Sequence, residues 1–207
     1  ILMGDVGAPY PLFVITGTTL WSVFVNSVLT PMQTVQSNRA ILVKINFPRE
    51  ALLVNAFYEI LFTTFINLII VVVFLVIFKV HLTTRCLLFF PGVFSLILLG
   101  MSIGLLVLPL AMLYKDIQFV LPTIFQFSMY LTPIVYSTPP VSGIGKILRL
   151  NPVSPLLIET RASLLNMNVY VPLWHIGLVM SFAIVLFILG IFLQRITIQT
   201  LIERMGS

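Results

Sequence analysis

Residues 86–114 read CLLFFPGVFSLILLGMSIGLLVLPLAMLY and contain no charged side chain. A helix needs about 20 apolar residues to cross roughly 30 Å of hydrocarbon, because it rises about 1.5 Å per residue. This stretch is longer than that minimum. Backbone N–H and C=O groups find no water in lipid, so a stretch of this kind is expected to form a transmembrane helix.

The whole chain has the composition of a membrane protein. Of its 207 residues, 59% are apolar and 8% are charged, whereas a soluble domain carries about 25% charged residues. This argues strongly against a water-soluble enzyme or a nucleic-acid-binding domain, and the 11 Lys and Arg residues are scattered singly without a basic run. Cys86 is the one cysteine, which excludes an internal disulfide framework and a cysteine-cluster metal site.

Five charge-free stretches predict five membrane-spanning helices. We place them at residues 11–33, 52–78, 87–113, 119–136 and 172–194. The expected fold class is an all-α, polytopic helical bundle. The odd number of spans and the opening residue Ile1 predict that at least one further span precedes this chain. Basic residues divide almost evenly between alternate loops, so the positive-inside rule gives no orientation.

Polar side chains form stripes in three of the predicted spans. They recur every three or four residues, which places each set on one helical face. The first span carries Thr19, Ser22, Asn26, Thr30 and Gln33, the second Asn55, Glu59, Thr63 and Asn67, and the fourth Phe119, Thr123, Gln126, Tyr130 and Pro133. Such stripes either make interhelical hydrogen bonds or line a polar conduit. The last span is almost free of polar residues and is expected to face lipid.

The loop between the first two spans reads QSNRAILVKINFPREALL over residues 36–53. Its mixture of apolar and basic residues predicts either a short interfacial amphipathic helix or a plain membrane-surface loop. As a docking element it would present Phe47 as an apolar anchor, with Arg49 and Glu50 as polar contacts. We expect Glu59, just inside the second span, to pair with Arg49 or Lys44 rather than to carry protons for transport.

Residues 137–171 predict short helices between the last two spans. The segment is rich in Pro and Gly, and a helical pattern over residues 152–165 puts Leu156, Leu157, Thr160 and Leu164 on one side. Glu159 and Arg161 are expected to lie away from that apolar side. The pattern fits a re-entrant or interfacial pair of short helices, or else a plain capping loop. In the third span, Gly100 and Gly104 form a GxxxG pattern that predicts close helix packing.

Four short motifs occur in a characteristic order along the chain: FPRE at 47–50, YKD at 114–116, LTPIVY at 131–136 and NP at 151–152. In these motifs and their spacing the chain resembles the permease subunit of type-2 ABC exporters for lipid-linked polysaccharides such as O-antigen, teichoic acid and capsule. Permeases of this family have six spans after an amphipathic N-terminal helix. The resemblance therefore implies that this helix and the first span precede residue 1 of a single permease domain, here residues 1–207.

The resemblance also implies roles for individual residues. The loop at residues 36–51 is cytoplasmic and meets an ATP-binding subunit through Asn46, Phe47, Pro48, Arg49 and Glu50. Residues 137–171 are extracytoplasmic, and Pro133 and Tyr136 lie near the outer end of the channel. The polar stripes add Thr19, Ser22, Asn26, Thr30, Gln126 and Tyr130 as expected channel-lining residues, because a hydrated sugar chain needs polar groups and aromatic faces.

The expected function is ATP-driven export of lipid-linked polysaccharide across the bacterial plasma (inner) membrane. The expected partners are a second copy of this chain, two ATP-binding subunits, the lipid-linked glycan and membrane lipid, with no nucleic acid. This chain is not expected to be an enzyme or to hold a cofactor, because ATP and Mg belong to the partner subunit. Export of a drug, haem or lipid by the same architecture, or an ATP-independent channel or secondary carrier, stays open as an alternative.

Overall fold

A computed structural model describes residues 9–38, 49–81, 83–114, 116–135, 153–167 and 174–205, with the backbone alone at 49, 50, 175 and 198–205. Within these residues there are six α-helices and a short 3-10 helix, and no strand. Asn46, Phe47, Pro48, Lys44 and Tyr136 lie outside the described residues, as does the predicted amphipathic helix of the first loop. The predictions made for them stay predictions.

Four helices are long and apolar enough to cross a membrane. They are α1 (Tyr10–Ser37), α3 (Arg49–Ile77), α4 (Phe89–Leu113), which follows directly on the 3-10 helix η1 (Thr84–Leu88), and α8 (Trp174–Met205). They occupy the positions predicted from the charge-free stretches at 11–33, 52–78, 87–113 and 172–194. The chain is therefore an all-α, polytopic membrane protein, as its sequence predicts.

The fourth predicted span, placed at residues 119–136, is helical but shorter than expected. Helix α5 covers Ile117–Leu131, which is 15 residues, and does not reach the length of the other four. Thr132 ends it in an extended conformation, with φ −97° and ψ 139°. The ring of Pro133 disfavours a helical conformation in the residue before it, so the chain leaves the helix ahead of the predicted end at residue 136.

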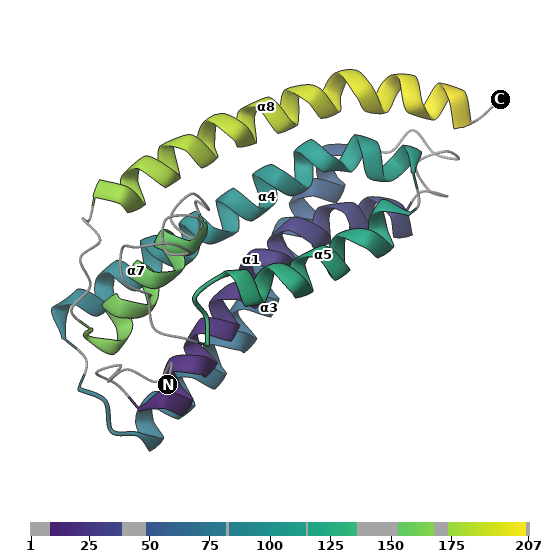
Figure 1. Cartoon of the computed structure of the whole chain (residues 1–207). Coiled ribbons are helices and arrows are strands. Elements are labelled where there is room, and N and C mark those ends of the chain that lie inside the picture. Colours follow the sequence, from purple (N-terminus) through teal and green to yellow (C-terminus); the bar gives the residue numbers. More distant parts are fainter. Residues whose placement is uncertain are drawn as a thin grey trace.

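Helix α4 forms the centre of the bundle (Figure 1). Helix α1 packs along one side of it and α8 along another, while α3 packs on α1. Helix α5 lies along α1, and the short helix α7 (Val153–Leu165) packs on α1, α4 and η1. A short helix predicted within residues 152–165 is thus confirmed.

Small residues allow α4 to approach α1 closely. A Cβ built on Gly100 would lie 2.6 Å from the Cβ of Ser27, and one built on Gly104 would collide with the carbonyl oxygen of Val28. Any larger side chain at these two positions must push the helices apart. The GxxxG pattern therefore does pack helix against helix, as predicted.

Helix α8 is held on another side of α4 by two hydrogen bonds. The Ser102 hydroxyl donates to the carbonyl oxygen of Ala183 at 2.9 Å, and the Gln194 amide donates to that of Leu105 at 3.2 Å. Between them, Gly190 leaves room for the Leu105 side chain, whose Cβ lies 2.9 Å from where a glycine Cβ would be. The polar side chains of Ser102 on α4 and Gln194 on α8 thus hold the two helices together.

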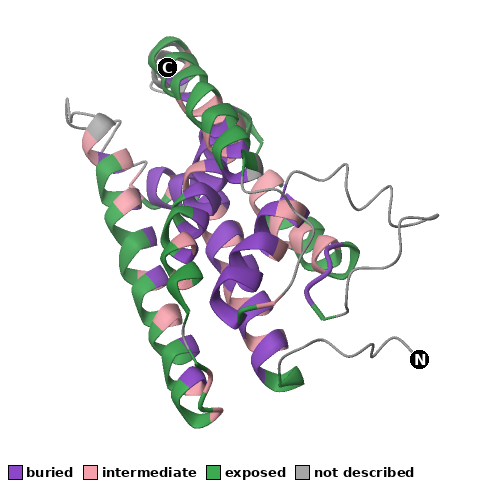
Figure 2. Ribbon diagram, turned by 90° about the vertical axis from the view of Figure 1, so that its left-hand side faces the viewer, coloured by how far each residue is buried: buried purple, intermediate pink, exposed green. Residues whose placement is uncertain are grey.

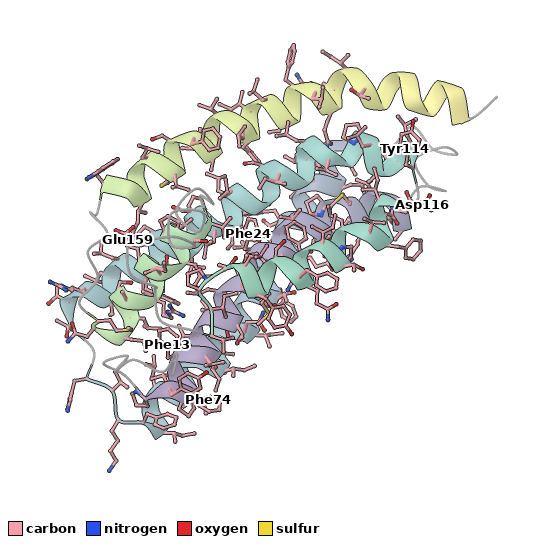
Figure 3. The ribbon with its side chains drawn as sticks, viewed as in Figure 1. Phe13, Phe24, Phe74, Tyr114, Asp116 and Glu159 are labelled. Carbon is pink, nitrogen blue, oxygen red and sulfur yellow. The ribbon has the colours of Figure 1, made fainter. Side chains whose placement is uncertain are left out.

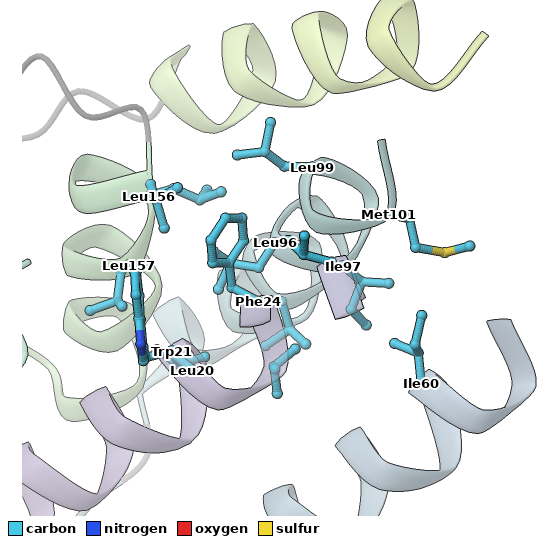
Figure 4. Packing of buried hydrophobic residues seen from close by; sticks show 14 of the residues in the cluster. Leu20, Trp21, Phe24, Ile60, Leu96, Ile97, Leu99, Met101, Leu156 and Leu157 are labelled. Atoms are coloured by element: carbon cyan, nitrogen blue, oxygen red, sulfur yellow. The ribbon is translucent and has the colours of Figure 1, made fainter. Parts of the chain in front are cut away.

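The apolar core lies where α1, α4 and α7 meet, and it includes Trp21, Phe24, Leu96, Leu156 and Leu157 (Figure 4). Exposed residues cover the outside of the bundle (Figure 2). On α3 and α8 these outward side chains are large and apolar, for example Phe62, Phe65, Phe182, Val185 and Phe192. Such faces suit a lipid environment, in agreement with the expectation that the last span faces lipid.

Candidate functional site

The polar stripe of α1 lies mostly on the face turned away from the core. Thr19, Ser22 and Asn26 are half-buried and Gln33 is exposed, whereas Leu20 and Phe24, which alternate with them along the helix, are buried. Thr30 differs from the rest of the stripe, since 7% of its surface is exposed. Four of the five stripe residues are thus open on one side.

Two buried hydroxyl groups elsewhere on α1, those of Thr16 and Ser27, are satisfied within the helix. Thr16 donates to the carbonyl oxygen of Leu12 at 2.8 Å, and Ser27 to that of Val23 at 2.7 Å. Bonds of this kind are the usual solution for Ser and Thr in a membrane helix. In the stripe, the Asn26 amide donates to the Ser22 hydroxyl at a long 3.4 Å, so donors and acceptors of both side chains remain for another partner.

Helix α5 brings the second set of predicted channel residues beside α1. The Phe125 ring packs edge-on against Phe24 and Trp21, with centroids 5.9 and 6.4 Å apart, and so fixes α5 to α1. Gln126 is exposed, and Tyr130 is 72% exposed. Helix α5 therefore packs on apolar rings of α1 through Phe125 and leaves an amide and an aromatic ring, those of Gln126 and Tyr130, exposed.

Pro133 does not line an open surface within this chain. It lies in the turn that follows α5 and is buried, and its carbonyl oxygen accepts a hydrogen bond from Arg161. The structure thus leaves most of the α1 stripe, Gln126 and Tyr130 outside the core, while it buries Thr30 and Pro133. The α1 side chains that pack on Phe125 of α5 are Trp21 and Phe24, which lie on another face of the helix than Ser22 and Asn26.

Glu59 contacts a hydroxyl group of the first span. The Thr34 hydroxyl donates to its carboxylate at 3.4 Å, which joins α1 to α3. Of the two expected basic partners, Lys44 is outside the described residues and only the backbone of Arg49 is described. On the same helix, Asn55 is exposed and Thr63 and Asn67 are half-buried, so the α3 stripe is open as well.

Both charged residues of α7 are buried, which corrects the expectation that they lie away from the apolar side. Glu159 is 6% exposed and Arg161 is 3% exposed. The expectation assumed a helix with one wet face. In fact α7 is enclosed by its neighbours, so that 11 of its 13 residues are buried. A sequence pattern reports the apolar face of a helix, but it does not report how many other faces are covered.

Arg161 binds the turn that follows α5. Its Nη1 donates to the carbonyl oxygen of Ile134 at 2.9 Å and its Nη2 to that of Pro133 at 3.1 Å. The guanidinium carbon lies 3.6 Å from the centre of the Phe13 ring, a cation–π contact. Burial lowers the pKa of Arg161 to about 9, so the side chain is charged at neutral pH.

Glu159, also on α7 (Figure 3), has no such partners among the described residues. Both carboxylate oxygens are buried, and no described residue donates a hydrogen bond to either of them. Burial raises the pKa of this carboxyl from 4.5 to about 7, because a low-dielectric surrounding disfavours the charged form. The sequence pattern placed Glu159 away from the apolar side of its helix and assigned it no role.

The described residues contain no group of three or more His, Cys, Asp or Glu side chains suited to a metal ion. Cys86, on η1, is a free thiol and half-buried. Searches for similar proteins add no assignment: no family model matches the chain, and no curated protein is significantly similar to it in sequence.

Proposed function

We propose that the chain is the transmembrane subunit of an ATP-driven exporter that moves lipid-linked polysaccharide across the bacterial inner membrane. One observation carries the proposal: a membrane bundle leaves a polar face of α1, with Ser22 and Asn26, partly open, and it also exposes Gln126 and Tyr130 of α5. Polar groups that face lipid are costly. This face therefore needs either water or another protein against it.

A second copy of the chain satisfies that requirement. Two copies that turn their α1 and α5 faces toward one another enclose a polar passage with aromatic rings on its wall. Sugar rings pack their C–H faces on aromatic side chains, and their hydroxyl groups bond to amides and hydroxyls. The order of the FPRE, YKD, LTPIVY and NP motifs supports the same assignment.

In this proposal energy comes from two ATP-binding subunits, which hold ATP and Mg. They dock on the cytoplasmic loop, where Asn46, Phe47 and Pro48 precede the first turn of α3 with Arg49 and Glu50. This chain supplies the passage and no catalytic group. Experiment distinguishes this proposal from two alternatives: export of a drug, haem or lipid, and ATP-independent transport.

The experiment reconstitutes the full-length protein in proteoliposomes with the ATP-binding subunit that co-purifies with it. Transport of a lipid-linked glycan is measured against ATP and, separately, against a pH gradient. We expect transport that requires ATP. Transport that follows the pH gradient and ignores ATP contradicts the exporter, and ATP-dependent movement of a drug or lipid but not the glycan contradicts the substrate.

A matched pair of α1 variants tests the passage itself. Asn26→Leu removes the stripe amide at nearly constant size and is expected to reduce export at least tenfold. Thr18→Val is the control, because the Thr18 hydroxyl donates only to carbonyl oxygens of its own helix, at 3.0 Å to Val14 and to Ile15. Equal export by the two variants would remove the α1 stripe from the passage.

A further inference from the structure

The buried carboxyl of Glu159 is not used in the proposed function. It belongs to α7, which lies outside the four helices long enough to span, and its two oxygens have no hydrogen-bond donor among the described residues. A charged carboxylate that is 6% exposed and unpaired is strongly disfavoured, and such a group takes up a proton instead. The position of this residue therefore calls for a proton or a cationic partner.

The elements packed on α7 offer little opposite charge. They are α1, α4, η1 and α8. Helix α4 has no titratable side chain, and the one in α1 is Tyr10, whose hydroxyl donates to the carbonyl oxygen of Val135 at 3.2 Å. The titratable residues of η1 and α8 are Arg85, Cys86, His175, Arg195, Glu203 and Arg204.

None of these groups is described as bonded to Glu159. Arg85 is exposed, the His175 side chain is outside the described residues, and the other three of α8 lie toward its far end (Figure 1). Arg161, on α7 itself, gives its two terminal nitrogens to the carbonyl oxygens of Pro133 and Ile134. Within the described part of the chain, a proton is the cation that fits Glu159.

Other contacts hold α7 in the bundle without help from Glu159. Thr160 fits directly against Gly92 of α4, where any Cβ would collide with its side chain. Arg161 ties the helix to the turn after α5, and Leu156 and Leu157 are at most 1% exposed in the core. An ionised Glu159 opposes these contacts and favours release of α7, because its charge returns to water when the helix leaves the bundle.

We propose that Glu159 is a proton-binding site whose occupancy governs the seating of α7: the carboxyl holds a proton while α7 is packed in the bundle and releases it when α7 moves out. This goes beyond the proposed function, since it concerns the seat of one helix and holds for any substrate.

The direction of the pH effect follows from the buried and exposed states. Burial raises the pKa of Glu159 from 4.5 to about 7. The seated state therefore binds the proton more tightly than the released state. In the pH range where the seated state holds more protons, raising the pH lowers its stability relative to the released state. Seating is strongest below pH 4.5, weakens as pH rises toward 7, and does not change further above 7 through this group.

The test follows Trp21, which is buried in the core that α7 completes. The chain has two tryptophans, so Trp174→Phe leaves Trp21 as the single reporter in the full-length protein. Quenching of its fluorescence by acrylamide is measured from pH 4.5 to 9 in lipid nanodiscs. We expect quenching to rise at least twofold with a midpoint between pH 5 and 7.5, and to stay low and flat in Glu159→Gln and in Glu159→Met.

Asp116→Asn is the matched control, because it removes an exposed carboxylate at the start of α5 and is expected to keep the wild-type transition. A flat wild-type curve, or a wild-type transition retained in both Glu159 variants, overturns the proposal. Infrared pH-difference spectra of the wild-type protein give a second test, which does not depend on whether the Glu159 variants fold. The chain has six Asp and Glu residues, so few carboxyl groups contribute to these spectra. We expect a protonated carboxyl above pH 6, and its absence overturns the proposal too.

Discussion

Gly17 of α1 lies directly against the guanidinium of Arg161. A Cβ built on Gly17 would be 3.0 Å from Nη1 of Arg161 and 3.0 Å from the carbonyl oxygen of Ile134 that this nitrogen binds. The hydrogen bond and its glycine neighbour come from three separate parts of the chain: α1, the turn after α5, and α7. Arg161 thereby joins three segments at one point.

Gly17→Ala is expected to lower the free energy of unfolding by about 1–3 kcal/mol, the usual cost of overpacking a filled site. Gly177→Ala is its control, because nothing lies within 4 Å of a Cβ at Gly177 of α8, and there alanine is expected to add roughly 0.5–1 kcal/mol. Thermal unfolding in detergent measures both. Equal shifts in the two variants would contradict the tight fit at Gly17.

Arg161→Lys is expected to lose about 1–3 kcal/mol of stability, even though the charge is kept. An ammonium group cannot bond both carbonyl oxygens while it lies over the Phe13 ring, as the guanidinium does, and a buried acceptor left without a donor costs this much. Arg85→Lys, at an exposed position of η1, should be nearly neutral. A stable Arg161→Lys protein would show that the three-segment contact adds no stability.

Gly104→Ala is expected to separate α1 from α4, because the new methyl group collides with the backbone oxygen of Val28, which cannot rotate away. A loss of about 1–3 kcal/mol follows for a contact of this kind. Leu110→Ala on the same helix is the control, since Leu110 is 51% exposed. Denaturant unfolding in mixed micelles compares the two, and a larger loss for Leu110→Ala would contradict the close α1–α4 packing.

Phe47→Ala is expected to weaken association with the ATP-binding subunit by about 2 kcal/mol or more, the cost of truncating a central apolar anchor. Co-purification and ATP hydrolysis in proteoliposomes measure the effect, while membrane insertion stays normal. Phe182→Ala removes an exposed ring from α8, away from the loop, and should assemble normally. Full assembly of the Phe47→Ala protein would remove that residue from the docking site.

The long helices were predictable from the sequence because a single physical requirement, the hydrocarbon thickness, sets their length. The end of α5 was not predicted, since the effect of Pro133 on Thr132 outweighs the apolar residues that continue beyond it. The burial of Glu159 and Arg161 was not predictable either. It depends on α7 being enclosed by helices distant in sequence, and the bonds of Arg161 go to backbone oxygens, which leave no mark in a sequence.

The polar faces could be predicted in part. Periodicity groups Ser22 with Asn26 on one face of α1, and both are half-buried, while Gln126 is exposed on α5, because the same spacing that defines a stripe defines a helical face. Periodicity cannot say which member of a stripe a neighbouring helix will cover, and so Thr30 was grouped with the others.

The short length of α5 has a consequence for the surrounding lipid. Fifteen residues rise about 22 Å, which is less than the roughly 30 Å of a typical hydrocarbon layer. Beside this helix the acyl chains must shorten or tilt, at a cost of fractions of a kcal/mol for each ångström of mismatch. The same lipid layer meets α3 and α8, which have 29 and 32 residues and are long enough to cross it, so the thinning falls on the α5 side alone. Two such molecules in one membrane reduce the total deformation of the bilayer when their α5 sides come together. The length of the acyl chains therefore affects the free energy of that association.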